Sequence, residues 1–254
     1  MSAEDYLGSA AELLDRIKST QLDQIREAAA LMADSVAAGG VVNLFGSGHS
    51  VLPVMDVFPR YGGYPAFRPL IDARLTWFNV LGSGGVTELL WLERQEGYIE
   101  NFLKNYPLRE TDTMMIYSHG GLNAAGIETA QYAKRLGMRT VVVTSAANTA
   151  LNEPTHSSGK RLADLADVVI DNCTPPEDSL VHIDGWPQPV AAGSTLSVIA
   201  ISMALVAELA AQLASRGIKL PVFVSPNVAG VSAEHNQQVF DQYARTIERG
   251  GNGR

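Results

Sequence analysis

Short, continuous apolar runs alternate with longer segments in which apolar residues recur every three or four positions. The apolar runs predict strands at residues 41–45, 65–70, 113–118, 139–145 and 167–171. The periodic segments predict helices that begin near residue 50 and at 88–104, 123–136, 194–215 and 232–247. Apolar strands that alternate with helices are typical of a parallel sheet covered on both faces. The pattern therefore predicts an α/β fold, a three-layer αβα sandwich built on a parallel, doubly wound sheet.

Residues 1–38 precede this alternation and are predicted to form two amphipathic helices with a break near residues 19–20. We expect this N-terminal helical pair to pack on the domain or on a partner subunit. The rest of the chain predicts one domain at residues 39–247 and a glycine-rich, disordered tail at 248–254. Within the domain, the polar stretch at 146–165 predicts a long functional loop over the carboxyl ends of the strands.

The 254-residue chain is long enough to bury the core of one large α/β domain. Its 19 Lys and Arg residues against 27 Asp and Glu residues give a formal net charge of −8, which argues against nucleic acid or an anionic membrane as a partner. The single cysteine, Cys173, excludes an intramolecular disulfide and a cysteine-cluster metal site, and it is typical of a reducing compartment. Because the histidines lack H-x-x-x-H and HExxH spacing, no metal is predicted.

The N-terminal segment lacks the basic start and the continuous apolar core of a signal peptide. The most apolar segment, at 196–213, contains Glu208 and other polar residues, so a transmembrane span is not predicted. We therefore expect a soluble, cytoplasmic protein. The apolar faces of the first two helices and of the helix at 194–215 favour a homodimer or a homotetramer.

Two glycine-rich turns follow predicted strands. The first loop is GSGHS at residues 46–50, and the second loop is SHGGLN at residues 118–123. Backbone amides and hydroxyl groups that gather where a strand meets a helix can bind an anion, most often phosphate. Because the carboxyl ends of parallel strands meet at one edge of a sheet, we predict that the two loops form one pocket.

Neither of two common nucleotide-binding motifs fits these turns. The first loop has Gly46 and Gly48 of a dinucleotide fingerprint, but Val51 stands at the position of the third glycine. The GK pair at 159–160 lacks the earlier glycine of a Walker loop and is followed by Arg161 rather than Ser or Thr. We therefore predict no cofactor.

The order strand, GSGHS, helix, strand, SHGGLN, helix, strand, Thr144-Ser145 resembles the sugar isomerase (SIS) domain family. The resemblance covers residues 38–215 and is greatest to stand-alone proteins related to phosphoheptose isomerase; HSSGKRL at 156–162 and Asn236 in the final helix add to it. It implies an SIS-like fold and the binding of a sugar phosphate at the loops. The substrate-binding residues that we predict from the loops and the resemblance are Ser47, Gly48, His49, Ser50, Ser118, Gly120, Gly121, Asn123 and Ser145.

The second loop departs from the family pattern Ser-x-Ser-Gly-x-Thr, so two hydroxyl groups that would face phosphate are missing. The backbone amides of Gly120 and Gly121 and the side-chain amide of Asn123 remain as donors. Either phosphate is held more weakly, or the ligand is not a simple phosphosugar. In the first loop, His49 either bonds the ligand or only covers the loop.

Aldose–ketose isomerisation needs a base that moves a proton between adjacent carbon atoms and a second group that carries the hydroxyl proton. Glu88 follows the GSGG run at 82–85 and begins a helix, and the resemblance implies that it is the base; alternatively it only complements the helix dipole. Glu93 and Glu96 compete for this role. The resemblance assigns the second proton transfer to His235, which in related isomerases often comes from a neighbouring subunit; alternatively it is a surface or capping histidine.

Arginine and aromatic residues lie between the two loops, and these residue types suit sugar or anion recognition. We interpret them as solvated surface. They are Arg60, Tyr61, Tyr64, Arg68, Arg74 and Trp77.

Together these patterns predict a phosphosugar-binding protein that acts as an aldose–ketose isomerase. Two alternatives remain open. One is a non-catalytic sensor or adaptor that binds a phosphosugar or a nucleotide, and the other is a lyase or deaminase of amino-sugar phosphates. Proton abstraction next to a carbonyl group serves all of these reactions, so the fold does not separate them.

Overall fold

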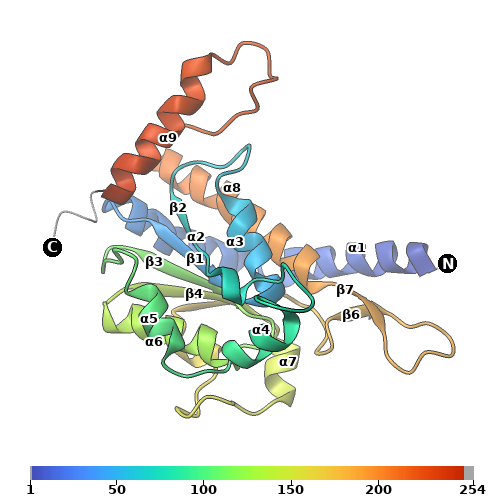
Figure 1. The fold of residues 1–254 in the computed structure, drawn as a ribbon. Helices are drawn as coiled ribbons and strands as arrows, with labels where there is room; N and C mark the ends of the chain where they lie inside the picture. The colour runs from blue at the N-terminus through green and yellow to red at the C-terminus, as the bar shows by residue number, and fades with distance from the viewer. Residues whose placement is uncertain (1, 249–254) are drawn as a thin grey trace.

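The computed structural model describes residues 2–248, in which helices cover both faces of a central sheet (Figure 1). The α-helices are α1 (Ser2–Thr20), α2 (Leu22–Ala37), α3 (Val51–Val57), α4 (Val86–Leu92), α5 (Tyr98–Leu103), α6 (Ala124–Arg135), α7 (Ala146–Leu151), α8 (Ser194–Ser215) and α9 (Ala233–Glu248). The short 3-10 helices are η1 (Gly48–Ser50), η2 (Ala73–Leu75) and η3 (Leu162–Leu165). The strands are β1 (Val42–Gly46), β2 (Phe67–Leu70), β3 (Thr113–Tyr117), β4 (Arg139–Thr144), β5 (Val168–Asp171), β6 (Ser179–Val181) and β7 (Val190–Ala192).

The main sheet has the strand order β2-β1-β3-β4-β5, and each neighbouring pair is parallel. Phe45 of β1 lies opposite both Leu70 of β2 and Ile116 of β3, so these strands end at the same edge of the sheet. The chain leaves β1 in one direction towards β2 and later returns on the other side as β3. The crevice at the carboxyl ends of β1 and β3 is therefore the switch point at which sheets of this kind bind ligands. The predicted three-layer α/β fold is confirmed.

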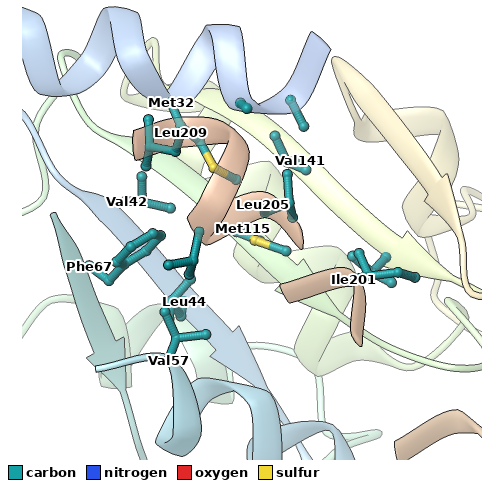
Figure 2. Close-up of a cluster of buried hydrophobic side chains, with 14 of the residues drawn as sticks. Met32, Val42, Leu44, Val57, Phe67, Met115, Val141, Ile201, Leu205 and Leu209 are labelled. Atoms are coloured by element: carbon teal, nitrogen blue, oxygen red, sulfur yellow. The ribbon is translucent and has the colours of Figure 1, made fainter. Parts of the chain in front are cut away.

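Successive strand residues alternate between two apolar layers. Leu44 and Met115 face the layer formed with α1, α2, α3, α8 and α9, and Figure 2 shows side chains from several of these elements meeting there. Phe45 and Ile116 face the opposite layer, formed with α4, α5, α6 and η3. Because the central strands are buried on both faces, their sequences are apolar throughout, which explains why they could be recognised from the sequence.

The longest helix, α8, is apolar enough in composition and long enough to cross a membrane. Core helices of globular domains have the same composition, and α8 packs against α2 and α3 as a core helix does. Its polar residues take part in this packing, because the buried hydroxyl group of Ser202 lies 2.8 Å from that of Tyr117 in β3. The sequence of α8 is thus explained by its position on the sheet.

Several local predictions differ from the structure. The helix expected at 88–104 is divided into α4 and α5, because Gly97 adopts a left-handed φ of 86°. The stretch at 146–165, expected to be a loop, begins with α7, whose N-cap Ser145 accepts a hydrogen bond from the amide of Asn148, and ends with η3. The antiparallel pair of β6 and β7 was not expected. The tail predicted at 248–254 lies outside the described residues except for Glu248, where α9 ends.

The expectation of a solvated surface between the loops is wrong for Tyr64 and Arg68, which are both buried. Tyr64 donates a hydrogen bond of 2.6 Å to the carbonyl oxygen of Val206 in α8. Arg68 forms a buried ion pair with Asp112, with 3.1 Å between Nη2 and Oδ2. Both side chains are buried because distant parts of the chain supply their partners.

Candidate functional site

The first loop turns sharply at the end of β1 and continues through η1 into α3. A Cβ atom at Gly46 would lie 2.1 Å from the carbonyl oxygen of Ser50, so the turn excludes any side chain there. Gly48 has a left-handed φ of 59°, and a Cβ atom on it would lie 2.3 Å from Nε1 of Trp77. The glycines therefore permit both the turn itself and the close approach of an indole ring.

Trp77 covers the first loop from the segment that follows β2. The imidazole of His49 stacks on its indole with the ring centres 4.8 Å apart and the planes 28° from parallel. Both side chains are exposed, so the stack forms a surface at the loop rather than part of the core. Of the two roles expected for His49, covering the loop accounts for this contact.

The second loop is fixed to the end of β4. The amide of Ser145 and the hydroxyl group of Thr144 both donate hydrogen bonds to the carbonyl oxygen of His119, at 2.9 and 3.1 Å. Ser118 Oγ accepts a hydrogen bond of 3.1 Å from the amide of Gly121. Gly121 itself has a left-handed φ of 63°, and its position is closed to a Cβ atom by Thr144. The loop is thus a preformed turn that has little freedom to rearrange.

The side chains of His119 and Ser145 have partners within the protein. His119 Nε2 lies 3.0 Å from the carbonyl oxygen of Pro176, so this ring nitrogen carries the hydrogen. Ser145 is buried; its Oγ caps α7 and donates a hydrogen bond of 2.9 Å to the carbonyl oxygen of Thr174. Ser145 was predicted to bind substrate, and in the structure its hydroxyl group joins two segments of the chain.

A buried carboxylate connects the two loops. Glu93 directly follows α4 and is 8% exposed. Its Oε2 accepts a hydrogen bond of 2.9 Å from Ser47 Oγ in the first loop, and its Oε1 accepts one of 2.9 Å from Asn123 Nδ2 in the second. Burial raises the pKa of the Glu93 carboxyl, and the hydrogen bond from Ser47 opposes this shift. Of the polar residues expected at the site, Ser47 and Asn123 are therefore brought together, and Glu93 is what joins them.

The segment between α7 and η3 also holds the second loop. Thr155 Oγ1 donates to the carbonyl oxygen of Leu122, and the amide of Leu162 donates to that of Gly121, both at 2.8 Å. In the middle of this segment, the buried His156 places Nε2 3.7 Å from Glu96 and 3.8 Å from Glu128. The location of this segment, at the carboxyl ends of the strands, is the one expected from its polar sequence.

Glu88 forms no hydrogen bond or ion pair with either loop in the described part of the chain. It lies on the exposed side of α4, and its Oε2 accepts a hydrogen bond of 3.3 Å from the amide of Gly84. Together with Val80, Leu81 and Trp91 it lines a surface hollow of about 470 Å³. Glu88 and Glu93 thus occupy different environments although they are close in sequence.

His235 belongs to α9, which lies far from α4 and α7 in Figure 1. Its Nε2 donates a hydrogen bond of 2.7 Å to the carbonyl oxygen of Val222, which precedes α9. Within one chain, His235 is therefore not part of the group formed by the two loops and Glu93.

Two solved structures with a similar fold are phosphoheptose isomerases, one from Francisella tularensis and one from Neisseria gonorrhoeae. The first is 15% identical and has a TM-score of 0.53, with 82% of this chain and 95% of that chain covered. The second is 14% identical and has a TM-score of 0.53, with 82% of this chain and 97% of that chain covered. At these identities the likeness shows the fold.

Full-length relatives are more similar in sequence. The UPF0309 protein SCO4393 of Streptomyces coelicolor is 36% identical over 249 residues, with 96% of both chains covered. The UPF0309 protein lin2794 of Listeria innocua is 32% identical over 243 residues, again with 96% of both chains covered. The sequence pattern of the SIS domain matches residues 5–145, a region that includes both loops and Glu93. This chain therefore belongs to the SIS domain family.

Proposed function

We propose that the protein binds a sugar phosphate between the first and second loops and interconverts its aldose and ketose forms, with Glu93 as the base. The observation that carries this proposal is the Glu93 carboxylate, which is buried and hydrogen-bonded to Ser47 and to Asn123. Membership of the SIS domain family and the fold shared with phosphoheptose isomerases support a sugar phosphate as the ligand.

The proposed reaction moves one proton between adjacent carbon atoms. A base removes the proton next to the carbonyl group and returns it to the neighbouring carbon, while a second group moves the hydroxyl proton in the opposite sense. A carboxylate suits the first task when its pKa is raised towards neutral pH, and burial acts on Glu93 in that direction. Its two hydrogen bonds fix its orientation, so little reorganisation is needed on binding.

The anionic end of the ligand would bind to the loop amides. Gly120 in the second loop and the start of η1 in the first loop lie where parallel strands end, and their backbone N–H groups are the proposed donors, since the amide of Gly121 already donates to Ser118 Oγ. Ser50 and Ser118 carry the remaining predicted hydroxyl groups of the loops. Holding the phosphate at the loops would place the sugar carbon atoms towards Glu93, which contacts both loops.

We further propose that the protein is a cytoplasmic homodimer or homotetramer that acts without nucleic acid or a membrane, in which α9 of one copy approaches the loops of another. Apolar side chains that remain exposed on one chain support this assembly, among them Leu7, Leu81 and Trp91. Such an arrangement would supply His235 as the second proton carrier. Light scattering on the purified protein measures the number of copies, and a monomer would exclude this part of the proposal.

A non-catalytic phosphosugar sensor is the second candidate. The observation that favours it is that the side-chain hydrogen bonds of Glu88 and His235 go to Gly84 and Val222, and not to the loops, within one chain. A sensor needs only the loops, and it needs no proton carrier.

The deciding experiment incubates the protein with a panel of hexose, heptose and amino-sugar phosphates in D2O. An isomerase gives the ketose or aldose partner with deuterium at the carbon next to the carbonyl group. Elimination or loss of ammonia would instead indicate a lyase or a deaminase. A ligand that raises the melting temperature without any deuterium incorporation would indicate a sensor. If no compound in the panel binds, the proposed function is wrong.

A further inference from the structure

Trp77 contacts the first loop, although it is distant from that loop in the sequence. Its Nε1 lies next to Gly48, and one face of its indole stacks on His49. It is 36% exposed, whereas Trp186, between β6 and β7, is 65% exposed. The indole N–H therefore lies at the first loop, on a ring that is partly exposed to solvent.

A network centred on Asp72 fixes the chain that leads to Trp77. Asp72 is buried, accepts a hydrogen bond from the amide of Arg74, and pairs with the guanidinium group of Arg74 at 3.1 Å. The hydroxyl group of Tyr98 also donates to Asp72, and the guanidinium group lies 5.1 Å from the centre of the Tyr98 ring. Leu75, two residues before Trp77, is fully buried. The position of Trp77 is therefore set by the fold.

The two loops lack hydrogen-bond donors that a residue such as Trp77 can supply. The second loop lacks two hydroxyl groups that the SIS pattern uses towards phosphate. An indole N–H can only donate, so it suits an anionic oxygen and cannot be satisfied by a cation. A hydrogen bond to a charged oxygen is also stronger than one between neutral groups.

We propose that Trp77 is a ligand-contacting residue whose indole N–H donates a hydrogen bond to an anionic oxygen of the ligand at the first loop, while His49 supports the ring. The inference rests on the proposed function, since it assigns a further donor to the same sugar-phosphate site. The contribution of Trp77 replaces a hydroxyl group that the second loop lacks.

The experiment uses ¹⁵N-labelled full-length protein and the best-binding sugar phosphate of the panel. The chain has three tryptophans, and W77F, W91F and W186F each remove one indole signal and so assign the spectrum. We expect the Trp77 indole proton to move downfield on saturation while the Trp186 signal stays in place. Movement of the first-loop amides without movement of the Trp77 signal would overturn the inference and leave the proposed function standing. If no signal moves with any compound, both fail.

The affinity of the Trp77 variant for the sugar phosphate, compared with that of the Trp186 variant, provides a second test. Loss of a hydrogen bond to a charged oxygen is expected to weaken binding roughly tenfold or more in W77F. W186F carries the same substitution on another surface, and its affinity should stay within about twofold of that of the wild type, as expected for a surface change away from the site. Equal affinities of W77F and the wild type would contradict the inference, and weak binding by S47A would still identify the site.

Discussion

Ser47 Oγ donates a hydrogen bond of 2.9 Å to Oε2 of Glu93, so the residue that follows β1 is joined to the residue that follows α4. Because Glu93 is buried, this bond is worth more than a contact in water, and its loss would leave a carboxylate oxygen without its partner. The second carboxylate oxygen is held by Asn123 in the same way. The orientation of the carboxylate therefore depends on both loops.

The first prediction concerns the base. Replacing Glu93 by Gln keeps the size of the side chain and one acceptor oxygen, but it replaces the other oxygen by an NH2 donor and removes the proton acceptor. We expect kcat for the isomerisation to fall about 10²- to 10⁴-fold, as is typical when a general base is removed. We expect the affinity for the sugar phosphate to change little, which calorimetry on the inactive variant would measure.

Glu88→Gln is the matched control for this prediction, because Glu88 is a second glutamate of the same region and lies on the exposed side of α4. We expect its kcat to stay within about twofold of the wild type, as for a surface substitution. The opposite result, an inactive Glu88→Gln and an active Glu93→Gln, would make Glu88 the base, as the sequence resemblance implied.

The second prediction concerns the dependence of stability on pH. Burial raises the pKa of Glu93 in the folded protein above its value in the unfolded chain. Such a group stabilises the fold fully at pH values below the unfolded pKa, about 4.3 for Glu, and this contribution is lost as the pH rises through the folded pKa. The Gln variant has no such group. The free energy of unfolding of Glu93→Gln relative to the wild type should therefore increase from about pH 4.3 upwards and then level off.

Urea denaturation of both proteins across this pH range measures the difference. All other titrating groups are shared, so they cancel in the comparison to the extent that they do not interact with Glu93. A difference that stays constant with pH, or that decreases, would mean that the carboxyl pKa is not raised in the folded protein.

Much of the fold and part of the site could be predicted from local sequence. The first and second loops were recognised because glycine-rich turns follow apolar strands, and in a parallel sheet such turns must lie at one edge. A Cβ atom at Gly46 would meet the backbone of Ser50, and one at Gly48 would meet the side chain of Trp77. The partial loss of hydroxyl groups in the second loop was also visible in the sequence.

The position of Glu93 could not be predicted in this way. In one continuous helix over 88–104, Glu88 and Glu93 would lie on different sides, because they are five residues apart. The sequence alone does not indicate which of these sides faces the loops. The side that faces the loops is set by the end of α4 at Leu92 and by the hydrogen bond from the Ala125 amide to the carbonyl oxygen of Glu93. Arg68 illustrates the same limit, because its charged partner is 44 positions away in the sequence.

The third prediction concerns the segment that holds the second loop. The amide of Ser158 donates to His156 Nδ1, so Nδ1 accepts and the ring hydrogen on Nε2 faces Glu96 and Glu128. Replacing His156 by Ala removes this buried ring, and among the described residues the Glu128 carboxylate then keeps only the hydrogen bond from the amide of Gly97. We expect the amides of 155–162 to exchange with deuterium roughly tenfold faster, because opening of this segment becomes easier by about 1.4 kcal/mol.

Hydrogen exchange measured by mass spectrometry tests this prediction, with His182→Ala as the control. His182 is exposed and belongs to the chain between β6 and β7. Its replacement should leave exchange in 155–162 unchanged. Equal exchange in His156→Ala and the wild type would show that Thr155 and Leu162 hold the segment without the histidine.

The fourth prediction concerns the amino ends of the strands, where Asp112 directly precedes β3 and is fully buried. It pairs with Arg68 and with Arg109, each at 3.1 Å, and it accepts a hydrogen bond of 3.1 Å from the amide of Val41. Removing one partner of a buried ion pair leaves an uncompensated charge, which typically costs 3–5 kcal/mol. We therefore expect Asp112→Ala to lower the free energy of unfolding by about 3–5 kcal/mol.

Asp23→Ala is the control for this fold-stability prediction, because it breaks an ion pair with Arg26 in which the Asp23 side chain is 93% exposed. Exposed pairs contribute less than about 1 kcal/mol, so its effect should be small. Asp112→Asn retains one oxygen for the amide of Val41, but it loses the charge and the second acceptor oxygen, which receives hydrogen bonds from Arg68 Nη2 and from the amide of Arg109. We expect its stability to lie between those of the wild type and Asp112→Ala. If Asp112→Ala were no less stable than Asp23→Ala in urea denaturation, the buried ion pair would not be a major determinant of the stability of this edge, and the hydrophobic layers would have to account for it.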